Sequence, residues 1–118
     1  MTTKNPANPR TILRQGDVLL LPVAAPSPAL RPVPPERGRI VLAHGEATGH
    51  HHSFAMSDRV ALFAEDGAGR GLFLTITGAA PAALEHQEHS TLLVVPGTWE
   101  VRRQREWSDA DEPIQVAD

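Results

Sequence analysis

Histidine is the residue type most able to do chemistry in this chain, and its six copies fall in two short stretches. The stretches are AHGEATGHHH and EHQEH, and they contain His44, His50, His51, His52, His86 and His89. Neutral imidazole nitrogen is a good ligand for transition metals and a poor one for magnesium or calcium. We therefore expect a divalent transition-metal ion (zinc, iron, nickel, manganese or copper) as the cofactor.

Spacing selects four of the six histidines as metal ligands. If HHHSF continues as a strand, His50 and His52 project from one face and His51 from the other. The i, i+3 spacing of His86 and His89 places both rings on one side of a turn or short helix. All four, or three of them with an open position, would then bind one ion. A solvated histidine tract that binds metal only adventitiously is the alternative.

Two glutamates stand among these histidines. Glu46 lies in the first stretch and Glu88 between the two histidines of the second. A carboxylate beside a metal-bound water can take its proton and return it later, so both are candidate catalytic residues. Either could instead be a further ligand or orient an imidazole through its N–H. We expect His44 either to contact a metal ligand without binding the metal itself or to contact the substrate.

Short apolar segments bounded by Gly, Pro and Asp run through most of the chain, as is typical of strands. They are DVLLLPV, GRIVLA, HHHSFAM, RVALFA, GLFLTIT, TLLVVP and TWEVRRQREW. The pattern predicts an all-β fold, a small single-domain β-barrel or sandwich of cupin-like type. The Ala-rich GAAPAALEHQEH allows at most a short helical turn near 80–88.

One domain is expected at this length of 118 residues. We expect it to span 11–107, between a flexible N-terminus over 1–10 and a flexible acidic tail over 108–118. The many prolines of the stretch 22–37 exclude a helix or a central strand there. This stretch is therefore predicted to be an extended loop around the domain.

The segment TWEVRRQREW places Arg103 and Arg105 on one face of a strand, between two tryptophans. Arginines in this setting could hold a carboxylate or phosphate of a substrate, or stack on bases. Ion pairs with glutamates of a neighbouring strand are the simpler explanation. Asp17, in RQGDV, is interpreted as part of a turn that leads into a buried strand.

Composition narrows the classes of function. The formal net charge of −3 and the pI near 6.0 give no general attraction for nucleic acid or anionic membranes, so neither is expected as a partner. The chain has no cysteine, which excludes disulfides, a thiolate nucleophile and cysteine-bound zinc.

No apolar stretch approaches the roughly 18 residues that span a membrane, so we expect a cytoplasmic protein. A small core and exposed strand edges favour a homodimer.

The motif GEATGHHH followed by HSTLLVVPGTWEV resembles a degenerate cupin, a small β-barrel family with His-x-His on one strand and a later Pro-Gly turn. The resemblance implies a metal site that includes His50 and His52. His86 or His89 would stand in for the histidine that cupins carry just after that turn.

A second resemblance covers residues 14–107. QGDVLLLPV, LAHGEATGHHH and LEHQEHSTLLVVPGTWEVRRQREW are similar to a family of small bacterial and phage-associated proteins without an assigned activity. It implies that the two histidine stretches belong to one unit, and it implies no reaction.

The sequence is compatible with three functions from different classes. The first is a metal-dependent enzyme of hydrolase, lyase or oxygenase type that acts on a small polar substrate at an open coordination position. The second is a non-catalytic module whose closed metal site stabilises a small core. The third is a nucleic-acid or protein interaction module without metal.

Overall fold

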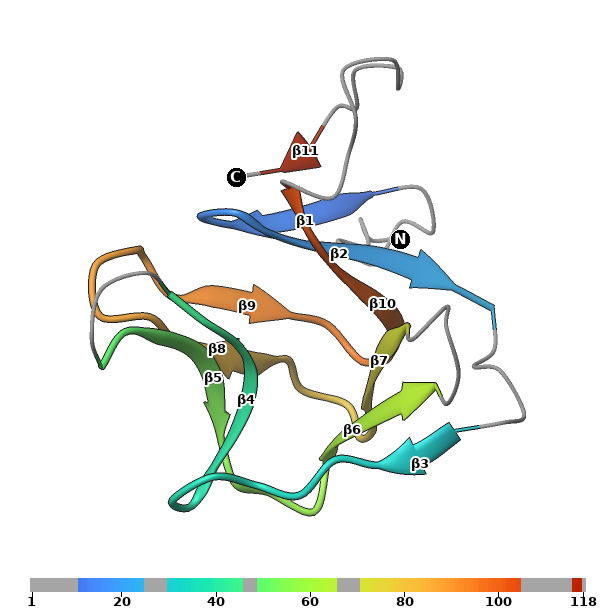
Figure 1. Cartoon of the computed structure of the whole chain (residues 1–118). Coiled ribbons are helices and arrows are strands. Elements are labelled where there is room, and N and C mark those ends of the chain that lie inside the picture. The colour runs from blue at the N-terminus through green and yellow to red at the C-terminus, as the bar shows by residue number, and fades with distance from the viewer. Residues whose placement is uncertain (1–10, 25–29, 46–48, 66–70, 105–115, 118) are drawn as a thin grey trace.

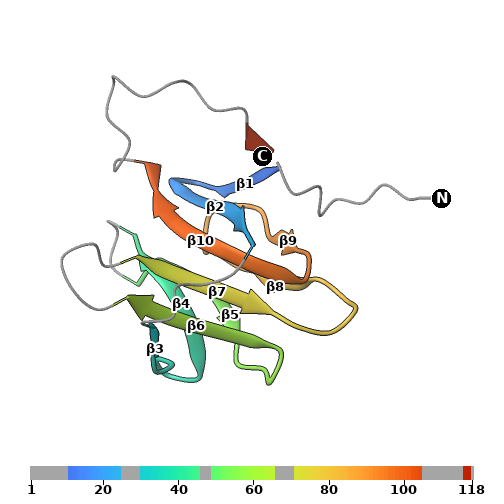
Figure 2. The same ribbon diagram turned by 90° about the vertical axis from the view of Figure 1, so that its right-hand side faces the viewer.

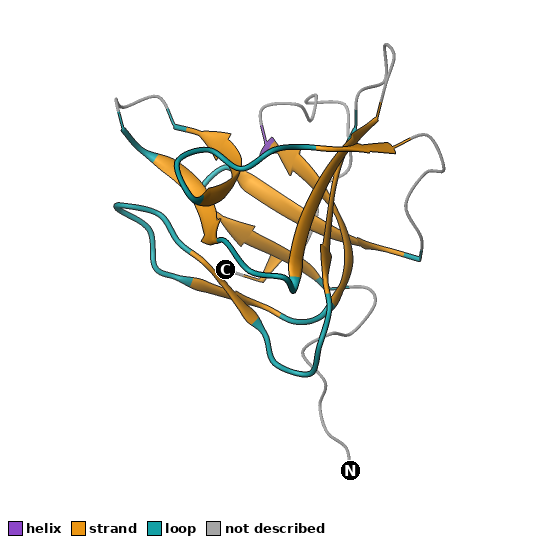
Figure 3. Cartoon of the chain, turned by 90° about the horizontal axis from the view of Figure 1, so that it is seen from below, coloured by secondary structure: helices purple, strands orange, loops and turns teal. Residues whose placement is uncertain are grey.

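The computed structural model describes residues 11–24, 30–45, 49–65, 71–104 and 116–117, and these residues form strands joined by turns (Figure 1). The strands are β1 Ile12–Gln15, β2 Val18–Val23, β3 Leu30–Pro32, β4 Arg39–His44, β5 His51–Ala55, β6 Val60–Glu65, β7 Leu72–Ile76, β8 Ala82–Leu84, β9 Leu92–Val94, β10 Gly97–Arg103 and β11 Val116–Ala117. No α-helix occurs among the described residues, and the short purple segment in Figure 3 is a single 3₁₀ residue at Gln104. The prediction of an all-β fold is therefore confirmed.

Three sheets make up the fold. The large sheet has seven strands in the order β11-β1-β2-β10-β7-β6-β3, and β4–β5 and β8–β9 form two-stranded hairpins. Neighbouring strands are antiparallel except β1 and β11, which are parallel. The hairpins lie against one side of the large sheet (Figure 2). These sheets do not close into a barrel, so the sandwich is the supported architecture and the cupin-like barrel is not.

The apolar core lies between the large sheet and the hairpins. Its most buried side chains come from both layers, since Leu20 and Leu74 belong to the large sheet and Phe54, Leu84 and Val94 to the hairpins, and each is at most 1% exposed. Burying one such side chain stabilises the fold by about 1.5–3 kcal/mol. Both layers are therefore needed to form the core.

The Ala-rich segment near 80–88 is a strand and bends rather than a helical turn. Ala82–Leu84 forms β8 and pairs with Leu92–Val94 of β9, and the Leu84 side chain is completely buried. Pairing and burial outweigh the helix preference of alanine. The short helical turn that the sequence allowed at most for this segment therefore does not form.

The proline-rich stretch 22–37 also contains strand residues. Pro22 extends β2 past the last residue paired with β1, and Leu30–Pro32 forms β3 at the edge of the large sheet. Both positions tolerate a residue without an N–H, because one side of the strand lacks a partner there.

The predicted ends 1–10 and 108–118 lie outside the described residues, apart from 116–117. No helix in the described part of the chain is long and apolar enough to cross a membrane.

Candidate functional site

A single β-bridge joins the two histidine stretches. The Ser53 N–H donates to the Glu85 carbonyl at 3.0 Å, and the Glu85 N–H donates to the Ser53 carbonyl at 2.8 Å. In an antiparallel pair the register continues one residue at a time in opposite directions. Residues 52, 51 and 50 therefore face residues 86, 87 and 88, which explains why the two stretches meet.

The outer face of this bridge is a network of hydrogen bonds. The His51 N–H donates to the Gln87 amide oxygen at 2.9 Å, and the His51 ring Nδ1 lies 2.9 Å from the Ser53 hydroxyl. Arg39 donates to that hydroxyl at 2.7 Å and forms an ion pair with Glu85. His51 therefore joins the two segments and faces away from His50 and His52, as the alternation along a strand predicts, and its ring lies 6.2 Å from that of His44.

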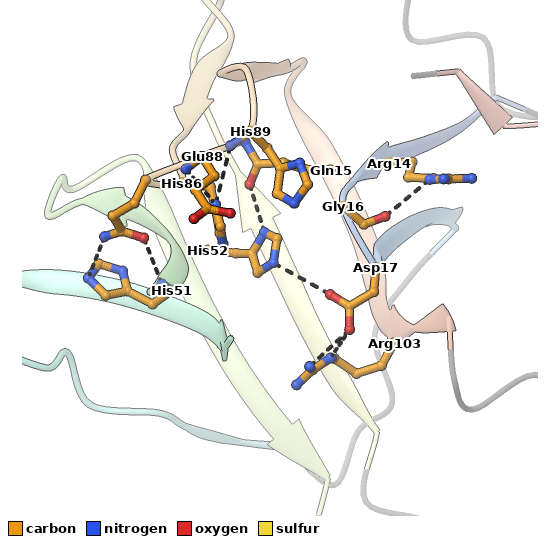
Figure 4. Close-up of polar contacts among 11 residues, drawn as sticks. Arg14, Gln15, Gly16, Asp17, His51, His52, His86, Glu88, His89 and Arg103 are labelled. Atoms are coloured by element: carbon orange, nitrogen blue, oxygen red, sulfur yellow. Dashed lines mark hydrogen bonds and ion pairs between the residues drawn. The ribbon is translucent and has the colours of Figure 1, made fainter. Parts of the chain in front are cut away.

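The inner face brings together the four histidines that the spacing selected, and Figure 4 shows His52, His86 and His89 of these. The His52 and His86 rings have centroids 4.4 Å apart, and the His86 and His89 rings 4.6 Å. The His50 ring lies 5.5 Å from that of His86. The two stretches thus form one cluster, while the predicted metal binding by these four side chains stays a prediction.

His52 is buried and held in one orientation. Its side chain is 2% exposed, and its Nδ1 lies 2.9 Å from the side-chain oxygen of Gln15. The Gln15 amide donates to the carbonyls of Leu84 at 2.8 Å and Ser90 at 2.9 Å, so its oxygen is left to accept from His52. His52 Nδ1 therefore carries the proton, and Nε2 presents a lone pair.

Asp17 faces that lone pair from the turn between β1 and β2. The Asp17 Oδ1 lies 3.6 Å from His52 Nε2, and its Oδ2 accepts from Arg103 Nη2 at 2.9 Å and Nε at 3.1 Å. Burial alone would raise the pKa of Asp17, but the hydrogen bonds and charge of Arg103 outweigh it and hold the pKa below 3.8. Burial, reinforced by His86, lowers the pKa of His52 to about 4. At neutral pH a carboxylate and a neutral imidazole nitrogen thus face each other with no proton between them.

Sequence reasoning missed Gln15 and Asp17. Asp17 follows a turn at Gly16, whose φ of 59° is a left-handed conformation that glycine adopts most readily. That observation fits the predicted turn, but the sequence contains no signal that the turn meets His52. Gln15 is 3% exposed inside a strand, and such a buried polar residue is recognisable only once the burial of β1 is known.

Gly16 also allows close approach of the turn to His89. A Cβ atom at Gly16 would lie 2.6 Å from the His89 ring Nε2. Real Cβ atoms do not come this close to a nitrogen, so a larger residue would displace the imidazole. Glycine here places His89 beside the turn that carries Asp17.

Replacement of Gly16 by alanine is expected to disturb this packing. Gly16→Ala and the control Gly38→Ala both place a side chain at positive φ, at a cost of about 1–2 kcal/mol, but a Cβ at Gly38 would have nothing within 4 Å. The atoms that the new Cβ meets belong to the exposed His89 ring, which can rotate away, so the two variants should lose similar free energies of unfolding in urea. The His89 NMR signals should shift only in Gly16→Ala. His89 signals that are unchanged in Gly16→Ala would contradict the contact.

The turn over 86–89 fixes the ring of His86. Its Nδ1 accepts from the backbone N–H of Glu88 at 3.0 Å and of His89 at 3.3 Å. In the neutral ring the proton then lies on Nε2. Burial, reinforced by His89, lowers the pKa of His86, which favours the neutral form. His86 therefore offers an N–H where His52 offers a lone pair.

The remaining predicted site residues are spread around this cluster. Glu88 is 71% exposed, and its Oε2 lies 3.7 Å from His50 Nδ1. His44 lies outside the cavity, where its Nε2 is 2.9 Å from Glu36. Arg103 contacts Asp17, as described above. Glu46 and Arg105 lie outside the described residues.

A cavity of about 540 Å³ contains the cluster. Its lining includes the four clustered histidines, and the other lining residues are Arg14, Gly16, Asp17, Gly45, Glu88 and Arg103. Within the described ranges, no three His, Asp or Glu side chains are already arranged to hold a metal ion. An ion would therefore require the imidazole rings to rotate towards a common point.

Comparison with known proteins identifies one family. The model of a domain of unknown function, DUF8820, matches residues 14–104. No curated protein and no solved structure matches the chain. The match spans the β1–β2 turn, both histidine stretches and Arg103, so the whole described cluster lies within it.

Proposed function

Because the chain belongs to the DUF8820 family, whose function is unknown, we propose from the geometry of the cluster alone that it binds a divalent transition-metal ion. The proposed ligands are His52 through Nε2, Asp17 through Oδ1, and His89. They come from β5, from the β1–β2 turn and from the turn between β8 and β9. Imidazole nitrogen with one carboxylate oxygen suits zinc, iron or nickel.

The observation that carries this proposal is the 3.6 Å between His52 Nε2 and Asp17 Oδ1. This separation is too long for a hydrogen bond. Two ligand atoms bound at 2.0–2.2 Å to one tetrahedral ion lie about 3.3–3.6 Å apart. The spacing therefore fits a pair of atoms that share a metal ion.

The groups behind these two ligands support the proposal. Gln15 accepts from His52 Nδ1, so Nε2 is the atom available for a metal. Arg103 donates twice to Asp17 Oδ2, and Asp17 Oδ1 lies 3.6 Å from His52 Nε2. Outer hydrogen bonds of this kind orient metal ligands in many proteins.

The cavity favours an ion with an open position. His86 presents an N–H, so the proposed set has three protein ligands, and the cavity of about 540 Å³ leaves room for a small polar molecule beside the ion. This space favours the metal-dependent enzyme as a second, finer proposal.

Removal of one ligand tests the metal site. In a competition assay with a chromophoric zinc chelator, Asp17→Asn is expected to weaken zinc binding by roughly 100-fold, equivalent to about 2.7 kcal/mol. Asp58→Asn makes the same chemical change at an exposed position outside the cavity and should leave the affinity within about twofold. Circular dichroism of both variants checks whether they are folded. Equal zinc affinity in the wild type and Asp17→Asn would contradict the proposal.

A further inference from the structure

The rim of the cavity contains a second pair of imidazole and carboxylate groups. His50 Nδ1 lies 3.7 Å from Glu88 Oε2, close to the 3.6 Å between His52 Nε2 and Asp17 Oδ1. A third such pair, His44 and Glu36, lies outside the cavity at 2.9 Å, which is an ordinary hydrogen bond. The two pairs in the cavity therefore share a wider spacing that the surface pair does not have.

The register of the bridge places the rim pair beside the inner pair. Residue 50 faces residue 88 just as residue 52 faces residue 86, because both continue from the bridge between Ser53 and Glu85. Positions two apart on a strand lie on the same face about 6.6 Å apart. His50 and Glu88 thus define a position next to that of His52 and Asp17, and distinct from it.

We propose that His50 and Glu88 bind a second divalent transition-metal ion beside the first. This inference rests on the proposed function, because the second ion needs the first site as its neighbour. The cavity is lined by five side chains with suitable donor atoms, apart from His86, which presents an N–H: Asp17, His50, His52, Glu88 and His89. A single tetrahedral ion uses at most four of them.

The second ion binds more weakly than the first. Glu88 is 71% exposed and the His50 side chain is 23% exposed, whereas His52 is 2% exposed. Solvent completes the coordination of an ion at such a rim, so fewer of its bonds are pre-organised by the protein. In this arrangement Glu88 is a ligand, and a metal-bound carboxylate is not available as a general base. The assignment therefore replaces the predicted catalytic role of Glu88.

Counting bound ions tests the inference. Native mass spectrometry and calorimetric titration of the metal-free full chain with zinc should give two ions in the wild type, the second about 10- to 100-fold weaker than the first. Glu88→Gln and, independently, His50→Gln should each retain one ion. Glu36→Gln removes the carboxylate of the hydrogen-bonded surface pair and should retain two.

The outcomes separate this inference from the proposed function. One ion in the wild type, or two ions in both Glu88→Gln and His50→Gln, would overturn the second site and leave the first intact. No bound zinc in the wild type would overturn both. Because Glu88 is exposed, its replacement by Gln is not expected to affect folding, and a thermal melt of each variant checks this.

Discussion

Zinc at a free concentration about 1,000 times its dissociation constant is expected to raise the free energy of unfolding by about 4 kcal/mol. The gain arises because the folded chain holds the ligands together and the unfolded chain does not. Urea unfolding in a zinc buffer, compared with unfolding in excess chelator, measures it. Zinc binding to histidines of the unfolded chain would reduce the gain.

This stabilisation should be large because the proposed ligands come from both layers of the sandwich. Asp17 belongs to the β1–β2 turn of the large sheet, whereas His52 lies in the β4–β5 hairpin and His89 in the turn of the β8–β9 hairpin. An ion would therefore connect the layers that enclose the core. In Asp17→Asn, whose zinc affinity is expected to be roughly 100-fold weaker, the gain should fall to about 1.4 kcal/mol at the same free zinc concentration. The same gain in Asp17→Asn and the wild type would contradict the assignment of this ligand.

Acidification is expected to destabilise the metal-free protein before its carboxylates are protonated. The pKa of His52 is about 4 in the folded chain and 6.5 for an ordinary histidine, so the unfolded chain binds more protons between these values. Stability therefore rises with pH through this window and is lost as the pH falls from about 6.5 towards 4. The loss amounts to at most about 3 kcal/mol. Chelator-treated protein unfolded in urea at a series of pH values measures the slope.

The variant His52→Leu identifies the source of this slope. Leucine does not titrate, so the dependence on pH between about 6.5 and 4 should become clearly shallower, although His86, whose pKa is also lowered, keeps part of it. A slope that is identical in the wild type and His52→Leu would show that His52 is not the buried neutral group.

The local parts of this structure follow from the sequence. The alternation of apolar residues predicts β7 and β10, where Leu74, Ile76, Trp99 and Val101 are buried on one face. The same alternation separates His51 from its two neighbours. The i, i+3 spacing correctly places His86 and His89 together, with ring centroids 4.6 Å apart, although they lie on a turn and not on a helix.

The contacts between residues that are distant in the sequence do not follow from the sequence pattern. Gln15 and His52 are 37 positions apart in the sequence, and the Ser53–Glu85 bridge depends on how the hairpins pack on one another. Local pattern carries no information on such pairings, because they depend on burial across layers. For the same reason a turn residue such as Asp17 was recognisable as a turn former and not as a partner of a buried imidazole.

The metal content of the protein as purified tests the central claim most directly. Untagged protein prepared without immobilised metal should contain at least one equivalent of a transition metal by inductively coupled plasma mass spectrometry. His52→Leu, prepared in the same way, should contain almost none. Wild-type protein that contains no metal and takes up none from added zinc, iron or nickel, or a metal content unchanged in His52→Leu, would contradict the account.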